Sequence, residues 1–378
     1  GPQAVRMGPS ALAGMIHMTS KIPTKKTSAR ALFSVESYNT FKEQVNLSSS
    51  ISKKLSTSLS ISKTDSDGYM KNTFLNQKDT SSLDELSVRS KSALKTEKLD
   101  ATLSIHYHDF NNGYDFFNQE NSLKTKSDKP GEDDQKILAA SVKLEYGNVN
   151  LKYVTVISHL DENSFYSYDE DWGNNIFWNQ LPGYNANYDY NIEFTKGRRH
   201  YYIDQRFILK KDLLVGVYYK NSYENFKEQA FEDELERKNV YGDYNTENSA
   251  FYIQNTMQLS SRHFIDYGVR FENRTASYND SLSNSFSPSE NMSGGSISYR
   301  IQNDAHNMNF ISLSKGFKAG GFNTQSNIEQ SRREFEQESI YNLEVGTKKV
   351  YAQNLVGSFT LFYMQREDIQ VRTSYQDD

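Results

Sequence analysis

Residues 55–62 read LSTSLSIS, and this segment decides the class of fold. In an extended strand, successive side chains point to opposite faces. One face of the segment therefore carries only apolar or β-branched side chains, namely Leu55, Thr57, Leu59 and Ile61. The other face carries only serines, namely Ser56, Ser58, Ser60 and Ser62. A strand with one apolar face and one hydroxyl face suits a sheet that separates hydrocarbon from water.

The same alternation recurs along the chain in segments of about ten residues, which is the sequence pattern of a transmembrane β-barrel. Such segments lie at 99–108, 138–146, 45–51, 213–219, 264–271 and 357–364. We predict an interior face that contains Ser56, Ser58, Ser60, Thr102, Ser104 and Lys143. We predict a lipid-facing set that contains Leu55, Leu59, Leu103, Ile105, Val142 and Leu144.

The connections alternate between short and long, as in outer-membrane barrels, which have short periplasmic turns and longer extracellular loops. Short links are expected near 52–54, 96–98, 147–148, 210–212, 260–262, 302–306 and 350–354. Long polar links are expected at 65–82, 109–135, 160–198, 223–247, 276–291 and 317–337. The pattern predicts an all-β protein, a transmembrane antiparallel β-barrel with about fifteen strands present. The alternative is a secreted sandwich or solenoid, but strands in ordinary sheets average only about five or six residues.

The composition excludes several classes of protein. Hydrophobic residues make up 36% and the mean hydropathy is −0.77, yet aromatic residues reach 13%, which argues against disorder. Cysteine is absent, so no disulfide, thiolate metal site or cysteine nucleophile is expected. The net charge of −5 comes from interspersed acidic and basic residues and leaves no basic stripe for nucleic acid. No apolar run approaches the roughly 18 residues of a membrane helix, and no constellation of side chains suggests an enzyme.

Two segments resemble the TonB-dependent receptor family. Residues 1–24, GPQAVRMGPSALAGMIHMTSKIPT, are similar to the end of the family's plug domain. The positions that fit its pattern are Gly1, Pro2, Gln3, Gly8, Ala13, Gly14, Ile16, Thr19 and Lys21. Residues 314–323, SKGFKAGGFN, are similar to a family signature at a strand top that leads into an extracellular loop. The likeness implies an outer-membrane receptor of a Gram-negative bacterium, with a plug inside a barrel of about 22 strands that is energised through TonB.

The resemblance divides the chain into residues 1–27, the C-terminal end of a plug domain, and residues 28–378, part of the barrel. A closed antiparallel barrel needs an even number of strands. With about fifteen strands, a first strand at 30–37 and a last strand at 355–365 run in the same direction. We therefore expect a curved open sheet with these two edges and with residues 1–24 against its concave face. The remaining strands, most of the plug and the TonB contact are expected outside this sequence.

The segment 163–191 places both tryptophans and many tyrosines in a long extracellular link. Aromatic side chains exposed at this density usually bind something. The candidate ligand-binding residues are Tyr166, Tyr168, Trp172, Trp178, Tyr184 and Tyr188. Their rings can stack on the apolar or aromatic face of a ferric siderophore. The alternative is that they belong to an interfacial girdle or fold the loop on itself.

Two smaller features admit a metal ion but have simpler explanations. His106 and His108 share the polar face of one strand and can ligate a metal, although spacing places no third ligand. Solvated lumen residues are the better account. Asp65, Asp67 and Gly68 resemble the start of a calcium loop but lack its distal acidic ligands, so a tight turn is expected. No cofactor and no metal are predicted.

The family resemblance makes import of a ferric siderophore the expected function, with the iron chelate, the TonB complex and outer-membrane lipid as partners. Lys315 and Lys318 can attract an anionic chelate, or they hold the strand top as structural residues. One alternative is the same transport mechanism for cobalamin or an oligosaccharide. Another is a passive porin, which needs no plug-like segment. A structural surface protein needs neither that segment nor SKGFKAGGFN.

Overall fold

The structure is a computed structural model that describes most of the chain. The described residues are 5, 16, 18–118, 121–173, 189–210, 212–304, 307–324, 328–329, 332–352 and 355–371. Within these ranges there is no helix long and apolar enough to cross a membrane.

The elements whose bounds fall within the described residues are all β-strands. They are β1 (Ser28–Glu36), β2 (Thr40–Ser50), β3 (Leu55–Ser66), β4 (Lys71–Asn72), β5 (Leu83–Lys95), β6 (Leu99–Tyr114), β7 (Lys124–Thr125), β8 (Gly131–Gly147), β9 (Leu151–Asp169), β10 (Tyr190–Leu209), β11 (Leu213–Glu232), β12 (Leu235–Gln258), β13 (His263–Asp280), β14 (Ser285–Phe286), β15 (Ser289–Gln302), β16 (Asn307–Lys318), β17 (Gly321–Phe322), β18 (Glu334–Phe335), β19 (Glu338–Ala352) and β20 (Leu355–Glu367).

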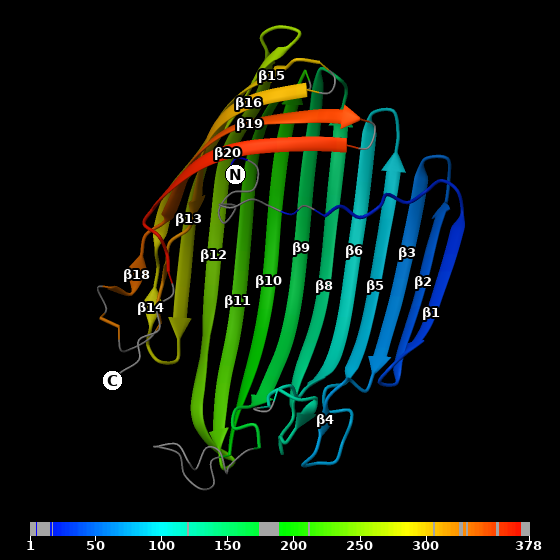
Figure 1. The fold of residues 1–378 in the computed structure, drawn as a ribbon, viewed down its shortest axis with the longest axis vertical. Coiled ribbons are helices and arrows are strands. Elements are labelled where there is room, and N and C mark those ends of the chain that lie inside the picture. The colour runs from blue at the N-terminus through cyan, green and yellow to red at the C-terminus, as the bar shows by residue number, and fades with distance from the viewer. Residues whose placement is uncertain are drawn as a thin grey trace.

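One large sheet contains nearly all of these strands (Figure 1). Its order follows the chain, β1-β2-β3-β5-β6-β8-β9-β10-β11-β12-β13-β15-β16-β19-β20, and β14 attaches to β13. Every pairing in it is antiparallel. The prediction of an all-β antiparallel sheet of about fifteen strands is confirmed.

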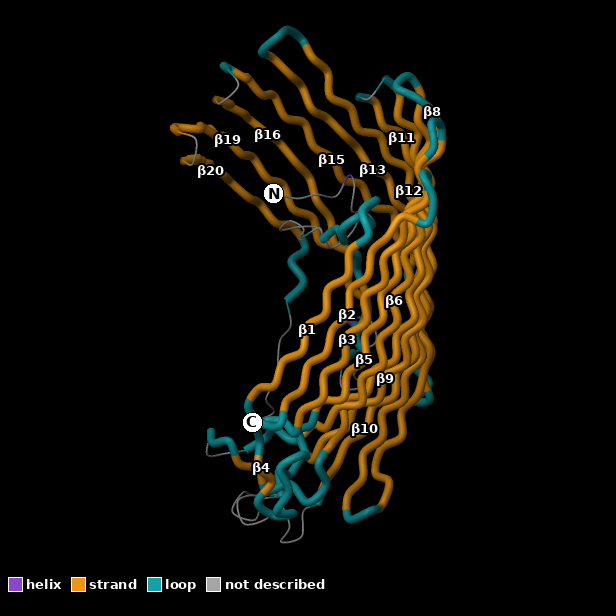
Figure 2. The backbone as a smooth tube through the Cα atoms, turned by 90° about the vertical axis from the view of Figure 1, so that its right-hand side faces the viewer, coloured by secondary structure: helices purple, strands orange, loops and turns teal. Residues whose placement is uncertain are grey.

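The sheet is a single curved layer that stays open (Figure 2). β1 and β20 form its two edges, as expected from the segments 30–37 and 355–365. Among the described residues no pairing joins β1 to β20. With no second layer to pack against, fully buried apolar side chains are few. Two of the buried apolar side chains in the described part of the chain, Met292 and Phe317, pack together as a small cluster, and the others are spread along the chain.

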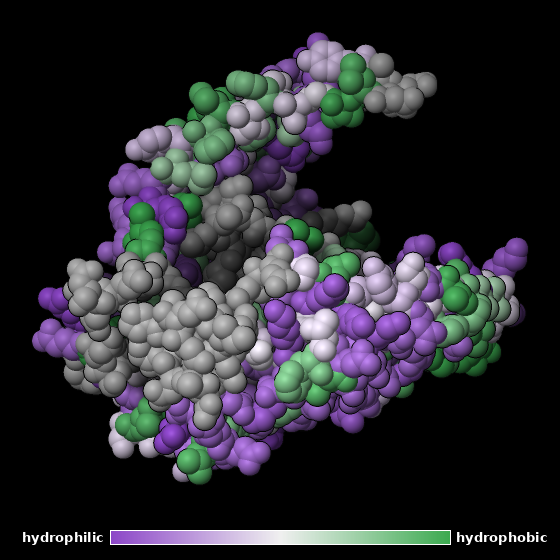
Figure 3. Space-filling view, turned by 60° about the horizontal axis from the view of Figure 1, so that its bottom comes forward, coloured by the Kyte–Doolittle hydropathy of each residue, from purple (hydrophilic) through white to green (hydrophobic). Residues whose placement is uncertain are grey.

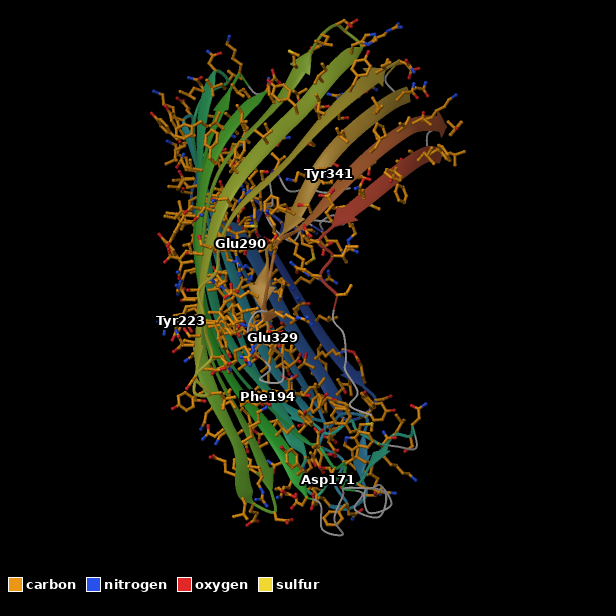
Figure 4. The ribbon with its side chains drawn as sticks, turned by 90° about the vertical axis from the view of Figure 1, so that its left-hand side faces the viewer. Asp171, Phe194, Tyr223, Glu290, Glu329 and Tyr341 are labelled. Carbon is orange, nitrogen blue, oxygen red and sulfur yellow. The ribbon has the colours of Figure 1, made fainter. Side chains whose placement is uncertain are left out.

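The register places the two predicted sets of side chains on opposite faces. Figure 4 labels Glu290 on the concave side of the sheet and Tyr223 on the convex side. A continuous row of paired residues ends at Glu290 and consists of Ser58, Lys91, Ser104, Ser141, Ser158, Tyr202, Lys220, Asn248, Arg274 and Glu290. A second row consists of Leu103, Val142, Ile157, Ile203 and Tyr219, the last on the same face of β11 as Tyr223. The predicted polar set therefore faces the concave side and the predicted apolar set the convex side.

Connections differ between the two ends of the sheet, as predicted, but one predicted long link is wrong and others are shorter than predicted. The link predicted at 160–198 is reduced to 170–189, because β9 extends to Asp169 and β10 begins at Tyr190, and the link predicted at 276–291 begins only after Asp280. At one end the links are short, such as 148–150 between β8 and β9. At the other end lie the long loops 67–82, 115–130 and 170–189. The segment 223–247, however, is strand on both sides of a two-residue turn, Asp233–Glu234, whose φ angles are +51° and +64°.

The error has a physical cause. Asn221, Tyr223 and Asn225 lie on one face of β11 and Ser222 and Glu224 on the other, so both faces are polar there. A strand solvated on both faces has no alternation of hydropathy, and alternation was the signal for a strand. We call the large curved sheet the wall. Its strands continue past the rows of apolar side chains on the convex face, and β8, β9, β10, β11, β12 and β13 are 17 to 24 residues long.

The described residues near the N-terminus touch the concave face. The Val5 side chain lies where a Cβ on Gly268 would be 2.9 Å from it. The Lys91 ammonium donates to the backbone oxygen of Ser20 at 3.0 Å. Val5 thus lies against β13, and Ser20 lies against β5.

The opposite faces of β8 give a direct test of which side meets hydrocarbon. We expect Val142→Arg to lower the free energy of folding into phospholipid vesicles by about 2–4 kcal/mol, because a lipid-facing arginine must be desolvated. Its neighbour Ser141→Arg points to the concave side and should cost much less. Equilibrium unfolding in urea, followed by tyrosine and tryptophan fluorescence, measures both. Equal losses in the two variants would show that neither face is the lipid face.

Candidate ligand-binding site

A group of aromatic rings gathers on the concave face at the loop end of the sheet. This aromatic cluster consists of Tyr69, Tyr114, Phe116, Phe117, Tyr166, Tyr168, Trp172 and Phe194. β9 and β10 position three of the rings, because Phe194 is paired with Tyr166 and Tyr168 follows two residues later on the same face. The Phe194 ring centre lies 6.1 Å from that of Tyr166 and 6.4 Å from that of Tyr168.

The loop after β6 supplies the next rings. Tyr114 ends β6 and meets Tyr166 edge-on, with ring centres 4.8 Å apart. Phe117 stacks on Trp172 at 5.8 Å with an interplanar angle of 11° and also contacts Tyr168 at 5.8 Å. Phe117 remains 37% exposed, so the cluster is open to solvent on one side. It is a surface rather than a closed core.

The loop after β9 presents Trp172 through a tight turn. Asp169 Oδ1 accepts hydrogen bonds from the backbone N–H of Asp171 at 3.1 Å and of Trp172 at 3.0 Å. Trp172 and Gly173 have φ angles of +58° and +61°, a region that costs a residue with a Cβ about 1–2 kcal/mol. Asp171 accepts from the N–H of Gly173 and of Tyr190, so its carboxylate links the two ends of the loop. Burial raises the pKa of the Asp171 carboxyl, and these two backbone N–H groups oppose that rise.

Three of the six predicted ligand-binding residues, Tyr166, Tyr168 and Trp172, meet in this cluster. The other three, Trp178, Tyr184 and Tyr188, lie outside the described residues. Sequence reasoning missed the partners from neighbouring segments, Tyr114, Phe117 and Phe194. A signal was present, because GYDFF at 113–117 is an aromatic run directly after an alternating strand.

The wall below the cluster carries paired charges. Arg198 Nε lies 2.7 Å from Glu224 Oε2, and its Nη1 lies 3.5 Å from Glu162 Oε1. Lys196 lies 3.2 Å from the other oxygen of Glu224. Two cations and two carboxylates thus balance within this group of the wall. Figure 3 views the molecule with the loop end forward and shows hydrophilic side chains over most of the described surface there.

The signature SKGFKAGGFN forms a second, more buried aromatic group. Phe322 stacks on Phe286 at 4.7 Å and lies 5.0 Å from Tyr278, and Phe286 is 3% exposed. Glu290 anchors the turn by accepting from the N–H of Gly320 at 2.8 Å and from Arg274 Nη1 at 2.8 Å. A Cβ on Gly320 would lie 2.4 Å from the backbone oxygen of Phe335, so the turn needs glycine there. Burial and these anchors indicate a packing role.

Three of the remaining sequence candidates, His108, Gly68 and Lys315, have local contacts in the structure. His108 Nδ1 lies 2.8 Å from Ser87 Oγ on the concave face. No group of three or more His, Asp or Glu side chains among the described residues is arranged to hold a metal ion. Gly68 has a φ of +79° in a tight turn, with Ser81 packed where a Cβ would stand. The Lys315 ammonium lies 5.7 Å from the centre of the Tyr341 ring, a contact within the wall itself.

These features define the class of protein. Long antiparallel strands, short turns at one end, long folded loops at the other, and an apolar face opposite a polar face make a transmembrane β-barrel wall. Residues 59–378 match the family model described as TonB dependent receptor-like, beta-barrel. The chain belongs to this family of TonB-dependent receptors.

Solved structures of similar fold include siderophore and ferric citrate receptors. The ferric yersiniabactin uptake receptor FyuA from Yersinia pestis has a TM-score of 0.79 at 17% identity, over 99% of this chain and 60% of that one. The siderophore receptor PiuA from Acinetobacter baumannii has a TM-score of 0.73 at 11% identity, over 96% and 60%. The ferric citrate transporter FecA in its unliganded form has a TM-score of 0.70 at 14% identity, over 96% and 55%.

At these identities the likeness is one of fold. This chain spans 55–60% of the length of those three receptors. A comparison of its sequence with curated proteins gave no match.

Gly173 offers a test of how the loops hold Trp172. A Cβ at this position would lie 1.9 Å from the backbone oxygen of Lys126. We expect Gly173→Ala to push the loop away and to reduce the near-ultraviolet circular dichroism that arises from Trp172 stacked on Phe117. Gly147→Ala is the control, because Gly147 also has a positive φ, +127°, but lies in a turn at the opposite end of the wall. An unchanged signal in Gly173→Ala would mean that the loop contact does not hold the tryptophan.

Proposed function

We propose that this protein is an outer-membrane receptor of a Gram-negative bacterium that imports a ferric siderophore, driven by the TonB complex. The observation that carries the proposal is the half-exposed aromatic cluster at the loop end of a wall that belongs to the TonB-dependent receptor family. The known structures of similar fold include a ferric yersiniabactin uptake receptor and a siderophore receptor. Transport, substrate and partners belong to the whole protein and are part of the proposal.

The chemistry of the cluster fits an iron chelate. Tyr166, Tyr168, Trp172 and, from the adjacent loop, Phe117 offer ring faces that stack on the flat or apolar arms of a chelate. Ligand sites in proteins commonly combine such faces with a few polar groups. Trp178, Tyr184 and Tyr188 belong to the same proposed site.

We further propose the domain division made from the sequence, with residues 1–27 as the C-terminal end of the plug and 28–378 as barrel. The contact of Lys91 with Ser20 and of Val5 with the wall at Gly268 supports a segment that lies inside the barrel. Such a segment is not needed in a passive porin.

A binding panel tests the proposed substrate class. The purified receptor is titrated with a ferric tris-catecholate, a ferric tris-hydroxamate, ferric citrate, cobalamin and a malto-oligosaccharide, and tryptophan fluorescence is followed. We expect saturable quenching by at least one ferric chelate and a weaker response to its iron-free form. Saturable binding of only cobalamin or the oligosaccharide would show that the substrate is not a ferric siderophore. If no member of the panel binds, the proposal is rejected.

The contribution of Trp172 is measured with the tightest chelate from this panel. We expect Trp172→Ala to raise the dissociation constant about fivefold or more, which corresponds to about 1 kcal/mol. Trp178→Ala should have a comparable effect if both rings bind. The control is Tyr241→Ala, because Tyr241 is 58% exposed and lies on the convex side of β12. An unchanged affinity in both tryptophan variants would show that these rings do not contribute to ligand binding.

A further inference from the structure

Two long loops at the loop end of the sheet pair with each other and form one unit. The loop 67–82 contains β4 and the loop 115–130 contains β7, and these two short strands pair in parallel. The backbone bonds run from Lys71 N to Leu123 O at 3.0 Å and from Thr73 N to Thr125 O at 2.9 Å. We call the two loops together the loop lobe.

A single buried carboxylate oxygen lies at the centre of the loop lobe. Asp115 Oδ2 accepts from Asn72 Nδ2 at 2.9 Å, from Thr80 Oγ1 at 2.7 Å and from Thr125 Oγ1 at 2.7 Å. Asp115 is 4% exposed, and Asn72 and Thr125 are fully buried. Asn72 Nδ2 also donates to the backbone oxygen of Ser127 at 2.7 Å. The three donors come from both loops, so Asp115 is the point at which the lobe is tied together.

The charge of Asp115 matters for this arrangement. A carboxylate oxygen accepts several hydrogen bonds, and bonds to a charged acceptor are roughly twice as strong as neutral ones. A buried charge with fewer partners would be costly. Asp115 therefore favours the conformation of the lobe in which Asn72, Thr80 and Thr125 all donate to it.

Asp115 is also part of the segment that carries the aromatic rings. The order is Tyr114, Asp115, Phe116 and Phe117. Fixing the side chain of Asp115 fixes the backbone on both sides of it. On one side Tyr114 meets Tyr166, and on the other Phe117 stacks on Trp172. Residues 114–117 therefore contribute both to the buried hydrogen bonds of the loop lobe, through Asp115, and to the aromatic cluster, through Tyr114, Phe116 and Phe117.

We propose that Asp115 is a positioning residue of the ligand-binding site, which holds the aromatic cluster in its binding geometry without touching the ligand. The inference rests on the proposed function for the role of the cluster in binding. The link between Asp115 and Trp172 can be measured without any ligand. A site held in advance in this way loses less conformational entropy when a ligand binds.

The first experiment measures the position of Trp172 in the ligand-free receptor. In a background where Trp178 and any tryptophan outside these 378 residues are replaced by Phe, so that Trp172 is the fluorophore, we expect Asp115→Asn to increase acrylamide quenching of its fluorescence. Asp79→Asn is the matched control, because Asp79 lies in the same lobe but is exposed. Thr80→Val and Thr125→Val remove one donor each and should give smaller increases. In the Asp115→Asn background, Thr80→Val should add little, since its bond to Asp115 is already weakened.

The second experiment measures binding of the tightest ferric chelate from the panel. We expect Asp115→Asn to raise the dissociation constant about tenfold, as for loss of bonds to a charged acceptor, and Asp79→Asn to leave it unchanged. Thermal unfolding is recorded for each variant. A purely structural role would lower the unfolding temperature while quenching and affinity of the folded receptor stayed at their normal values.

The outcomes separate the two proposals. Unchanged quenching in Asp115→Asn overturns the positioning role, whatever the ligand. Increased quenching with unchanged affinity also overturns it, because the cluster would then move without consequence for binding. If no chelate binds the unmodified receptor, the proposed function fails, while the quenching result alone decides whether Asp115 holds Trp172.

Discussion

Antiparallel pairing in a single layer is the constraint on which the rest of this structure depends. Each strand satisfies the backbone groups of its neighbours, and side chains alternate between faces along every strand. A shift of one residue in any pairing would exchange the two faces beyond that point. The row from Ser58 to Glu290 stays on the concave face through all the intervening strands. Keeping this register gives the wall its polar inside and apolar outside.

A wall of this kind is held on its concave face by polar contacts where a sandwich would have an apolar core. Arg270 Nε lies 2.7 Å from Glu272 Oε2, and the two side chains are only 2% and 0% exposed. Asn248 donates to the other oxygen of Glu272, and the Arg270 guanidinium lies over the rings of Tyr218 and Tyr252. A buried ion pair stabilises a protein only when its remaining hydrogen-bonding groups are satisfied. Here other strands supply Asn248 to the carboxylate and the rings of Tyr218 and Tyr252 to the guanidinium, so the network depends on the register.

The sequence predicted those parts of the fold in which hydropathy differs between the faces of a strand. LSTSLSIS predicted the orientation of β3, and the resemblance of SKGFKAGGFN predicted a strand top followed by a turn, which Gly320 makes. The segment 223–247 was predicted as a loop because its strands are polar on both sides. The aromatic cluster was predicted only where its residues are close in sequence, as for Tyr166, Tyr168 and Trp172. Phe117 and Asp115 were missed because their contacts cross from one loop to another, and single-sequence patterns contain no information about such pairings.

The long strands and the folded loops are parts of one arrangement. β9 runs on to Asp169 and β10 begins at Tyr190, both beyond the apolar rows of the convex face. Tyr166 and Tyr168 lie near the end of β9, and Phe194 lies near the beginning of β10. If these strands ended with the apolar band, the rings would lie on loops and each would need its own support. Because the strands continue, three rings are fixed by the sheet register. The loop lobe then has only to bring Tyr114, Phe116 and Phe117 against them, and one carboxylate with three donors from two loops is sufficient to do that.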